Sequence, residues 1–292
     1  MTRRALRVAT RESKLARWQA DHVGELLRAA HPRIDVEMVF VRTAGDQRTD
    51  VPLHAIGGQG VFVREVQHAV LDGRADLAVH SAKDLPSSPT AGLRIAAVPA
   101  RADGRDALAG AHLDALSAGA VVATGSVRRR AQLAHLRPEL TFVELRGNID
   151  TRLAKVPPGG AIVVALAALH RLGYDDRADY AFAVDEMVPQ VGQGALAVET
   201  TDDDVAALVA AIDHAPSHAC IDAERAFLAE LGGGCELPAG AYAEVVDGAL
   251  FMRAFLADGE RYWREDTSGP LDDHDWARQA ARRAKAVVGS AE

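Results

Sequence analysis

The sequence contains little cysteine, and this excludes several kinds of site. Its 292 residues include only Cys220 and Cys235, fifteen residues apart and without a CxxC motif. A metal site built on cysteine needs more ligands than these, so we expect no metal. Two isolated cysteines are typical of a chain that stays in the reducing cytoplasm with both thiols free of disulfides. Cys220 falls inside an expected helix and is predicted to be a small buried side chain.

Long hydrophobic runs and a surplus of positive charge are also missing. A transmembrane helix needs roughly 20 apolar residues, and the longest candidate run, 161–169, is about half that length. Residues 1–5 lead directly into a strand-like segment and contain no apolar signal core. The formal net charge of −8 argues against a nucleic-acid or membrane-surface partner. We therefore expect a cytoplasmic protein that binds neither.

Lysine is scarce as well, and arginine takes its place. The chain has four lysines and 29 arginines. Composition alone explains part of this bias, because the chain is also rich in alanine. However, the planar guanidinium of arginine binds a carboxylate through two parallel hydrogen bonds, which an ammonium group cannot do. The positions of the arginines must decide between composition and function.

Strand and helix patterns alternate along most of the chain. Helical segments of 10–18 residues between short apolar strands predict parallel sheets covered by helices on both faces. A polar break at 101–105 and a return segment at 191–194 divide the pattern into two halves. The pattern predicts strands at 6–10, 36–42, 75–80, 93–98, 121–124, 141–145 and 161–164, and helices at 13–30, 61–71, 127–136, 151–155, 166–172 and 202–212.

The last part of the chain changes character. A helix at 217–231 precedes strands separated by the hairpin signals Asp247–Gly248 and Asp258–Gly259, and a helix at 272–288 ends the chain. The sequence thus predicts an α/β protein with two hinged, doubly wound lobes, like a periplasmic binding protein, and a small C-terminal α+β domain. The predicted domains are 1–98 with 194–213, then 99–193, and finally 214–292.

Three expected strand-to-helix junctions carry arginines. Arg11 precedes Ser13, which by residue type is an N-cap; Arg128, Arg129 and Arg130 fill the first turn of the helix at 127–136; Arg146 and Arg152 flank the third junction. A cation at a helix N-terminus opposes the helix dipole unless an anion lies nearby. A solvated basic face would explain one of the arginines at 128–130 better than all three. The junctions therefore predict an anion site at the carboxyl ends of the strands.

Two further segments could carry chemistry. Asp84 follows a buried strand and precedes Leu85–Pro86, where a carboxylate can stabilise a turn, transfer a proton or stabilise a developing cation. Cys235 follows three glycines, which suits a thiol that a bulky group must reach, although a free cysteine is more often buried. His80 is expected to be packed, and Arg171 lies at a helix C-terminus, where a cation is favourable without any ligand.

Taken together, these segments resemble the hydroxymethylbilane synthase family, also called porphobilinogen deaminases. The resemblance runs in order over nearly the whole chain and weakens after about residue 250. Any one segment would be modest support, whereas five in register are specific. The segments are Ala9–Ala16, His80–Pro86, Arg146–Asn148 with Thr151–Leu153, Val191–Ala195 and Gly233–Cys235.

The resemblance implies a stepwise condensation. Enzymes of this family join four porphobilinogen molecules head to tail, release ammonia at each step and hydrolyse off the linear tetrapyrrole hydroxymethylbilane. The primer is a covalent dipyrromethane, one per chain, which the resemblance places on Cys235 through a thioether. Asp84 matches the catalytic aspartate. The resemblance is also compatible with a monomer.

The resemblance further implies how the polycarboxylate chain is bound, because each pyrrole carries an acetate and a propionate. Gln59, Gly125 and Arg130 depart from the residues common in the family, and the place of Arg130 stays open. The cofactor-binding positions are Cys235, Lys83, Asp84, Ser81, Thr124, Ser126, Arg128, Arg129 and Arg146, and the substrate-binding positions are Arg11, Ser13, Arg152, Arg171 and Gln193.

Two alternatives remain at this stage. A non-catalytic bilobal protein that binds an anionic metabolite would use the same lobes and arginines, but it gives no reason for Cys235 or for a third domain. A different transferase with a nucleophilic cysteine would need an activating histidine or a helix N-terminus near Cys235, and the sequence shows neither clearly.

Overall fold

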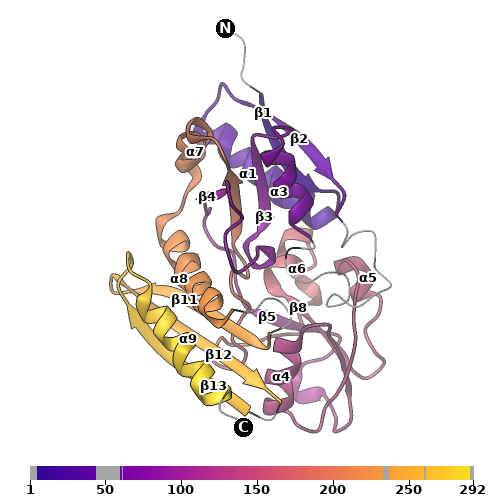
Figure 1. Cartoon of the computed structure of the whole chain (residues 1–292). Coiled ribbons are helices and arrows are strands. Elements are labelled where there is room, and N and C mark those ends of the chain that lie inside the picture. Colours follow the sequence, from indigo (N-terminus) through magenta and orange to yellow (C-terminus); the bar gives the residue numbers. More distant parts are fainter. Residues whose placement is uncertain (1–4, 44–59, 61, 233–236, 260, 290–292) are drawn as a thin grey trace. The chain divides into compact units, whose positions relative to one another are not determined.

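The computed structural model describes residues 5–43, 60, 62–232, 237–259 and 261–289. The chain forms two compact units (Figure 1). The first comprises residues 1–101 and 195–218, and the second comprises 102–194 and 219–292. The chain therefore passes from the first unit to the second, back to the first and again to the second.

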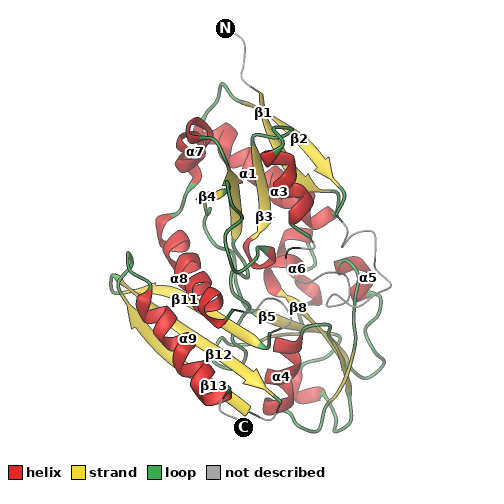
Figure 2. Ribbon diagram, in the orientation of Figure 1, coloured by secondary structure: helices red, strands yellow, loops and turns green. Residues whose placement is uncertain are grey.

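The first unit contains a five-stranded sheet in the order β2-β1-β3-β10-β4. Its first three strands are parallel, and the last two each run antiparallel to their neighbours. Leu6 and Val8 pack with α1 and α7 on one face, whereas Ala9 packs with α3 on the other, so both faces are covered (Figure 2). The elements are β1 (Ala5–Arg11), α1 (Lys14–Ala30), β2 (Asp35–Val41), α3 (Arg64–Leu71), β3 (Leu77–Ser81), β4 (Arg94–Ala97), β10 (Leu196–Thr200) and α7 (Asp203–Val209).

The second unit contains a five-stranded sheet in the order β7-β6-β8-β5-β9. Its fourth strand, β5, comes first along the chain, whereas the fourth strand of the other sheet, β10, comes last. Again three strands are parallel and two are antiparallel to their neighbours. Leu133 of α4 packs on one face and Leu169 of α6 on the other. The elements are β5 (Asp106–Ala109), β6 (Val121–Ala123), α4 (Val127–Leu136), β7 (Thr141–Val143), α5 (Ile149–Leu153), β8 (Ala161–Ala165), α6 (Leu166–Leu172) and β9 (Tyr180–Ala181).

Both sheets are mixed, and the prediction of purely parallel sheets was wrong on this point. Parallel neighbours need a crossover connection, whereas a strand that enters from elsewhere in the chain can lie antiparallel. β5 and β10 enter in this way, directly after the chain has crossed between the units. The four-residue strand β5 was not predicted, because Asp106–Ala109 contains no β-branched or aromatic residue. The predicted fold class of two α/β sheets with a small C-terminal domain is confirmed.

A three-stranded antiparallel sheet lies near the C-terminus, in the order β11-β12-β13. Asp247 and Gly248 both have positive φ, of 50° and 79°, as a two-residue hairpin turn requires. Helix α9 packs on this sheet through alanines such as Ala280 and Ala284, and Phe227 of α8 lies in the same core. The elements are α8 (Ala215–Leu231), β11 (Ala239–Val246), β12 (Ala249–Asp258), β13 (Arg261–Gly269) and α9 (Asp275–Val288).

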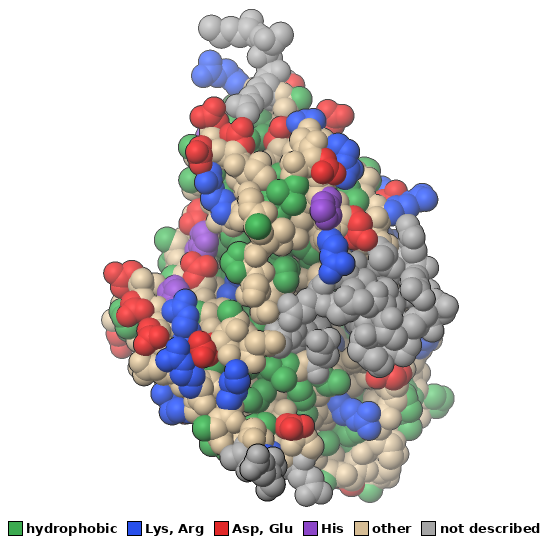
Figure 3. Space-filling view, viewed as in Figure 1, with side chains coloured by type: hydrophobic (Ala, Val, Ile, Leu, Met, Phe, Trp, Pro, Cys, Tyr) green, Lys and Arg blue, Asp and Glu red, His purple; other side chains and the backbone are tan. Residues whose placement is uncertain are grey.

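Part of the arginine surplus stabilises this C-terminal sheet and its helices. Acidic and basic side chains lie interspersed over α9 in the space-filling view (Figure 3). Arg282 pairs with Glu230 at 3.0 Å, and Arg283 also pairs with an acidic side chain, Glu265. These arginines are explained by ordinary surface ion pairs and not by a ligand. No helix within the described ranges is long and apolar enough to cross a membrane.

Candidate active site

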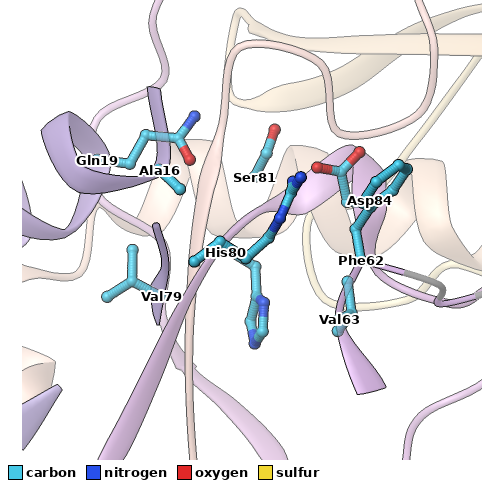
Figure 4. Close-up of a pocket in the computed structure, with 9 residues that line it drawn as sticks. Ala16, Gln19, Phe62, Val63, Val79, His80, Ser81 and Asp84 are labelled. Atoms are coloured by element: carbon cyan, nitrogen blue, oxygen red, sulfur yellow. The ribbon is translucent and has the colours of Figure 1, made fainter. Parts of the chain in front are cut away.

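A pocket opens in the first unit at the carboxyl ends of β1 and β3. This edge of an α/β sheet is where ligands bind, because strand ends and helix N-termini meet there. The pocket combines a carboxylate, a guanidinium and an aromatic ring (Figure 4). Its lining residues are Arg11, Ala16, Gln19, Phe62, Val63, Val79, His80, Ser81 and Asp84.

The β1–α1 junction places Arg11 in this pocket. Arg11 is the last residue of β1, and its guanidinium carbon lies 4.4 Å from the centroid of the Phe62 ring. Ser13 is the N-cap of α1, as predicted, and its Oγ accepts a hydrogen bond from the backbone N–H of Ala16 at 3.3 Å. The Ser13 hydroxyl caps the N-terminus of α1 and so fixes the turn that follows Arg11. The cation–π contact with Phe62 holds the Arg11 guanidinium at the pocket wall.

Asp84 ends a 3-10 turn, Ala82–Asp84, that follows β3. The backbone N–H of Ala82 donates to the carbonyl of Ala195 at 3.0 Å, which ties the turn to the segment before β10. The Asp84 side chain is half-buried and lies beside Phe62 in the pocket (Figure 4). Ser81 also lines the pocket, and Lys83 is half-buried between these two residues in the sequence. Asp84 thus combines a turn position with a carboxylate that lines the pocket.

His80 is buried, as predicted, but it belongs to a polar cluster that the sequence did not indicate. Its Nε2 lies 3.2 Å from Oε2 of Glu199 on β10, and both side chains are almost fully buried. The same Glu199 oxygen accepts a hydrogen bond from Nε2 of Gln67 at 2.8 Å, and Oε1 of Gln67 accepts one from Thr90. The imidazole points away from the Asp84 carboxylate (Figure 4). The cluster lies behind the pocket wall.

A second cluster, in the second unit, is built on Asp106 at the start of β5. Nη2 of Arg128 donates to Oδ2 of Asp106 at 2.6 Å. Nε and Nη2 of Arg129 both donate to Oδ1, at 3.0 and 2.7 Å. Nε2 of Gln193 donates to the same Oδ1 at 2.9 Å and to the carbonyl of Gly104 at 2.8 Å. Asp106 therefore joins two predicted cofactor residues and one predicted substrate residue.

The Asp106 cluster is buried and carries net positive charge. Asp106 and Gln193 are fully buried, and Arg128 and Arg129 are 3% and 6% exposed. Burial would raise the pKa of Asp106, but the two guanidiniums outweigh it and lower that pKa to about 2. The carboxylate is therefore ionised at neutral pH. Two guanidiniums against one carboxylate leave one positive charge inside the protein.

The β6–α4 junction holds these arginines in place and separates them from Arg130. Ser126 is the N-cap of α4, and its Oγ accepts from the backbone N–H of Arg129 at 3.4 Å. Oγ1 of Thr124 accepts from the backbone N–H of Ser126 at 3.2 Å. Arg130, by contrast, is exposed, and its guanidinium carbon lies 5.9 Å from the ring centroid of Phe142. Arg130 thus has a surface contact of its own.

Two of the three remaining predicted arginines, Arg152 and Arg171, donate to backbone carbonyls of the second unit. Nε of Arg152 donates to the carbonyl of Gly147 at 2.8 Å, and Nη2 of Arg171 donates to that of Gly194 at 2.6 Å. Arg171 lies in the last turn of α6, as predicted, and burial lowers its pKa to about 10. Nη1 of Arg146 is buried and has no hydrogen-bond partner among the described residues. A buried guanidinium N–H of this kind fits an anionic ligand.

The structure thus brings the predicted residues together in two places. Arg11, Ser81 and Asp84 line the pocket of the first unit, and Arg128, Arg129 and Gln193 meet on Asp106 in the second. Cys235 and Gln59 lie outside the described residues. Sequence reasoning missed four residues of these sites, because an isolated apolar, amide or acidic residue carries no motif. They are Gln19, Phe62, Asp106 and Glu199.

Comparisons with known proteins agree on one family. Residues 6–208 match the family model described as "Porphobilinogen deaminase, dipyromethane cofactor binding domain", and residues 218–274 match "Porphobilinogen deaminase, C-terminal domain". The porphobilinogen deaminase of Chromobacterium violaceum is 46% identical over 292 residues. That alignment covers 97% of this chain and 94% of the relative.

Solved structures give a weaker likeness. The periplasmic VFT2 domain of BvgS from Bordetella pertussis aligns with a TM-score of 0.40 and 16% identity over 71% of this chain and 86% of that domain. YhfZ from Shigella flexneri aligns with a TM-score of 0.40 and 18% identity over 76% of this chain and 93% of the other. At these scores the likeness supports no conclusion about this chain.

Proposed function

The chain belongs to the porphobilinogen deaminase family, also named hydroxymethylbilane synthases, and we propose that its catalysis depends on Asp84 in the first-unit pocket. It is a transferase of tetrapyrrole biosynthesis that uses a dipyrromethane cofactor and acts on porphobilinogen. One observation carries the assignment of Asp84. Its half-buried carboxylate shares a pocket with the guanidinium of Arg11 at the carboxyl edge of the sheet. An amine substrate that carries carboxylates needs both groups.

The arginines of the second unit fit the dipyrromethane. The group carries several carboxylates, and the Asp106 cluster contains a buried excess of one positive charge. The buried Nη1 of Arg146 supports the same assignment. When bound, the group supplies the pyrrole carbon to which the first substrate is joined. We assign its attachment to Cys235 through a thioether, and its binding to Ser81, Lys83, Asp84, Thr124, Ser126, Arg128, Arg129 and Arg146.

Asp84 acts on the substrate in two steps of each addition. When the C–N bond of the aminomethyl group breaks, the departing amine takes a proton and leaves as ammonia. The carboxylate of Asp84 stabilises the positive charge that remains on the substrate pyrrole. A carbon–carbon bond then forms to that methylene carbon, and Asp84 can accept the proton that the attacking ring carbon loses.

The other predicted residues bind carboxylates of the substrate and of the growing chain. A guanidinium holds a carboxylate through two parallel hydrogen bonds, and a helix N-cap adds a hydroxyl at a site that favours anions. Arg11 and Ser13 serve this role in the first unit. Arg152, Arg171 and Gln193 serve it in the second. Because each added ring brings two further carboxylates, the sites must exchange their ligands as the chain grows.

Three wider assignments complete the proposal. The enzyme works in the cytoplasm as a monomer and without nucleic acid, in line with its net charge of −8 and its scarcity of cysteine. Its domains are 1–98 with 194–213, then 99–193, and finally 214–292. The last two of these domains fall within one compact unit. Calorimetry on the full chain can show whether these two domains unfold in separate transitions.

Intact mass spectrometry of the full chain tests the function. The wild-type protein should exceed its sequence mass by one dipyrromethane and give the colour of pyrroles with an acidic aldehyde reagent. Cys235→Ala should lose both the added mass and the colour, whereas Cys220→Ala is the matched control and should keep them. An unmodified, colourless wild-type protein would instead support a non-catalytic protein that binds an anionic metabolite.

A further inference from the structure

Asp106 has a position that the proposed function does not explain. It is fully buried at the start of β5 and opposite Ala165, the last residue of β8. It therefore lies at the carboxyl edge of the parallel strands, where a sheet of this kind binds ligands. A carboxylate is an unexpected residue in a site for carboxylates, because like charges repel. Its presence there requires a reason.

The contacts of the two arginines supply the reason. Besides Asp106, Arg128 donates from Nη1 to the carbonyl of Val188 at 2.5 Å. Arg129 donates from Nη1 to the carbonyl of Val163 at 2.9 Å. Each guanidinium is thus fixed at two points, by Asp106 and by a backbone carbonyl. The arginines are oriented by the protein itself and need no ligand to order them.

The carbonyl of Val188 is held rigidly as well. Gln132 binds both backbone groups of Val188, since Nε2 donates to its carbonyl at 3.0 Å and Oε1 accepts from its N–H at 2.7 Å. The buried Glu224 of α8 accepts from the backbone N–H of Gly192 at 2.7 Å and from that of Ala243 at 2.8 Å. Gln193 follows Gly192 directly and donates to Asp106. The segment around the cluster is therefore fixed from both sides.

We propose that Asp106 is a positioning residue, which orients Arg128 and Arg129 and cancels one of their two charges, so that the pair takes one further carboxylate. The inference rests on the proposed role of this pair in binding the dipyrromethane. Without Asp106, two guanidiniums would lie close together in a buried site with no counter-ion. They would repel each other and would collect a small anion from solution. With Asp106, one charge remains for the ligand.

The test is Asp106→Asn in the full-length chain. The substitution keeps the shape and removes the charge. The measured quantity is the rate at which unloaded chain gains the dipyrromethane mass when incubated with porphobilinogen. The loss of hydrogen bonds to charged groups should slow this loading by about tenfold or more. In addition, sodium acetate should raise the melting temperature of the variant that already carries the dipyrromethane and leave that of the loaded wild type unchanged. In the loaded wild type, Asp106 and one carboxylate of the ligand balance both guanidiniums, whereas the loaded variant keeps one unbalanced positive charge.

Asp76→Asn is the matched control. Asp76 accepts from Nη2 of Arg7 at 2.9 Å and from its Nε at 3.3 Å, so it forms a similar two-point pair in the first unit, away from the predicted site residues. This control should lose stability but load at the wild-type rate and show no response to acetate. Such a result would separate positioning from a general loss of stability.

The outcomes distinguish this proposal from the function on which it rests. A wild-type chain that never gains the dipyrromethane mass would overturn the function. A loaded wild type, together with an Asp106→Asn variant that loads equally fast and ignores acetate, would overturn the positioning role alone. If Asp106→Asn does not fold, the double variant Asp106→Asn/Arg128→Gln restores a single positive charge and should fold. If the double variant is also insoluble, the claim that Asp106 acts by cancelling one guanidinium charge would be wrong.

Discussion

The two five-stranded sheets have the same pattern of parallel and antiparallel neighbours, and each carries a buried acid on its fourth strand. In the first sheet this acid is Glu199 of β10, and in the second it is Asp106 of β5. Their registers differ. Glu199 lies opposite Ala78, the second residue of β3, whereas Asp106 lies opposite Ala165, at the carboxyl end of β8. The fourth strand therefore places its acid behind the pocket in one sheet and at the carboxyl edge in the other.

The partners of the two acids differ in a way that suits this difference. Glu199 contacts His80 and the uncharged amide of Gln67, whereas Asp106 contacts Arg128 and Arg129, which are always charged. The first unit thus presents a carboxylate, Asp84, beside the guanidinium of Arg11 in its pocket. The second presents a buried excess of positive charge around Asp106. The proposed proton transfer uses the first arrangement, and the proposed binding of the dipyrromethane carboxylates uses the second.

The largest expected effect breaks the chemistry of the first unit. Asp84→Asn should lower turnover by about 10²-fold or more, because it removes a group that transfers a proton and stabilises positive charge. The melting temperature should change little, since the side chain is only half-buried. Ammonia release under saturating porphobilinogen measures the rate. Near-normal turnover would remove Asp84 from the proposed mechanism and with it the contrast between the units.

The two buried acids, Asp106 and Glu199, should differ in how much they contribute to the free energy of unfolding. Asp106→Asn should lower the free energy of unfolding by about 3–5 kcal/mol, because it leaves two buried guanidiniums without a counter-ion. Glu199→Gln should cost only about 1–3 kcal/mol, because the new amide oxygen can still accept the hydrogen bond from the uncharged Gln67. Urea unfolding at pH 7 gives both values. Equal losses would contradict the difference drawn between the two clusters.

A smaller effect is the loss of unfolding free energy at acid pH, where Asp106 becomes protonated. The folded-state pKa of Asp106, about 2, lies below its unfolded value of 3.8. Its contribution to stability is therefore complete above about pH 4 and is lost as the pH falls toward 2, at about 2 kcal/mol in total. The stability difference between wild type and Asp106→Asn should be constant from pH 7 to 4 and shrink below that. A difference that shrinks already near neutral pH would contradict the ion pairs.

The smallest effect concerns Arg130, which follows two buried arginines but faces outward. Arg130→Ala should cost about 0.5 kcal/mol, the value of an exposed cation–π contact, here with Phe142. Turnover and dipyrromethane loading should not change. Urea unfolding and a steady-state assay measure the two effects. A loss of loading would place Arg130 in the anion site of the second unit after all.

Much of the fold and part of the site could be predicted from the sequence. The helix at 127–136 and the N-cap Ser13 of α1 could be predicted because periodicity and capping are local. The strand β5 was not, because Asp106–Ala109 acquires its structure only from neighbouring strands. For the same reason the arginines were recognised as an anion site, but their counter-ion was missed. Arg128 and Asp106 are 22 residues apart in the sequence, and only the sheet brings them together.

The segment from Val188 to Gly194 has a consequence for how related sequences can vary in length. Side chains from α4, α8 and α6 bind its backbone at Val188, Gly192 and Gly194. Gly194 has a φ of +87°, and a side chain there would collide with the carbonyl of Ala102. A single insertion or deletion would break all of these contacts at once. Lineages of active relatives should therefore keep this spacing unchanged, whereas the hairpin at Asp247–Gly248 is free to lengthen.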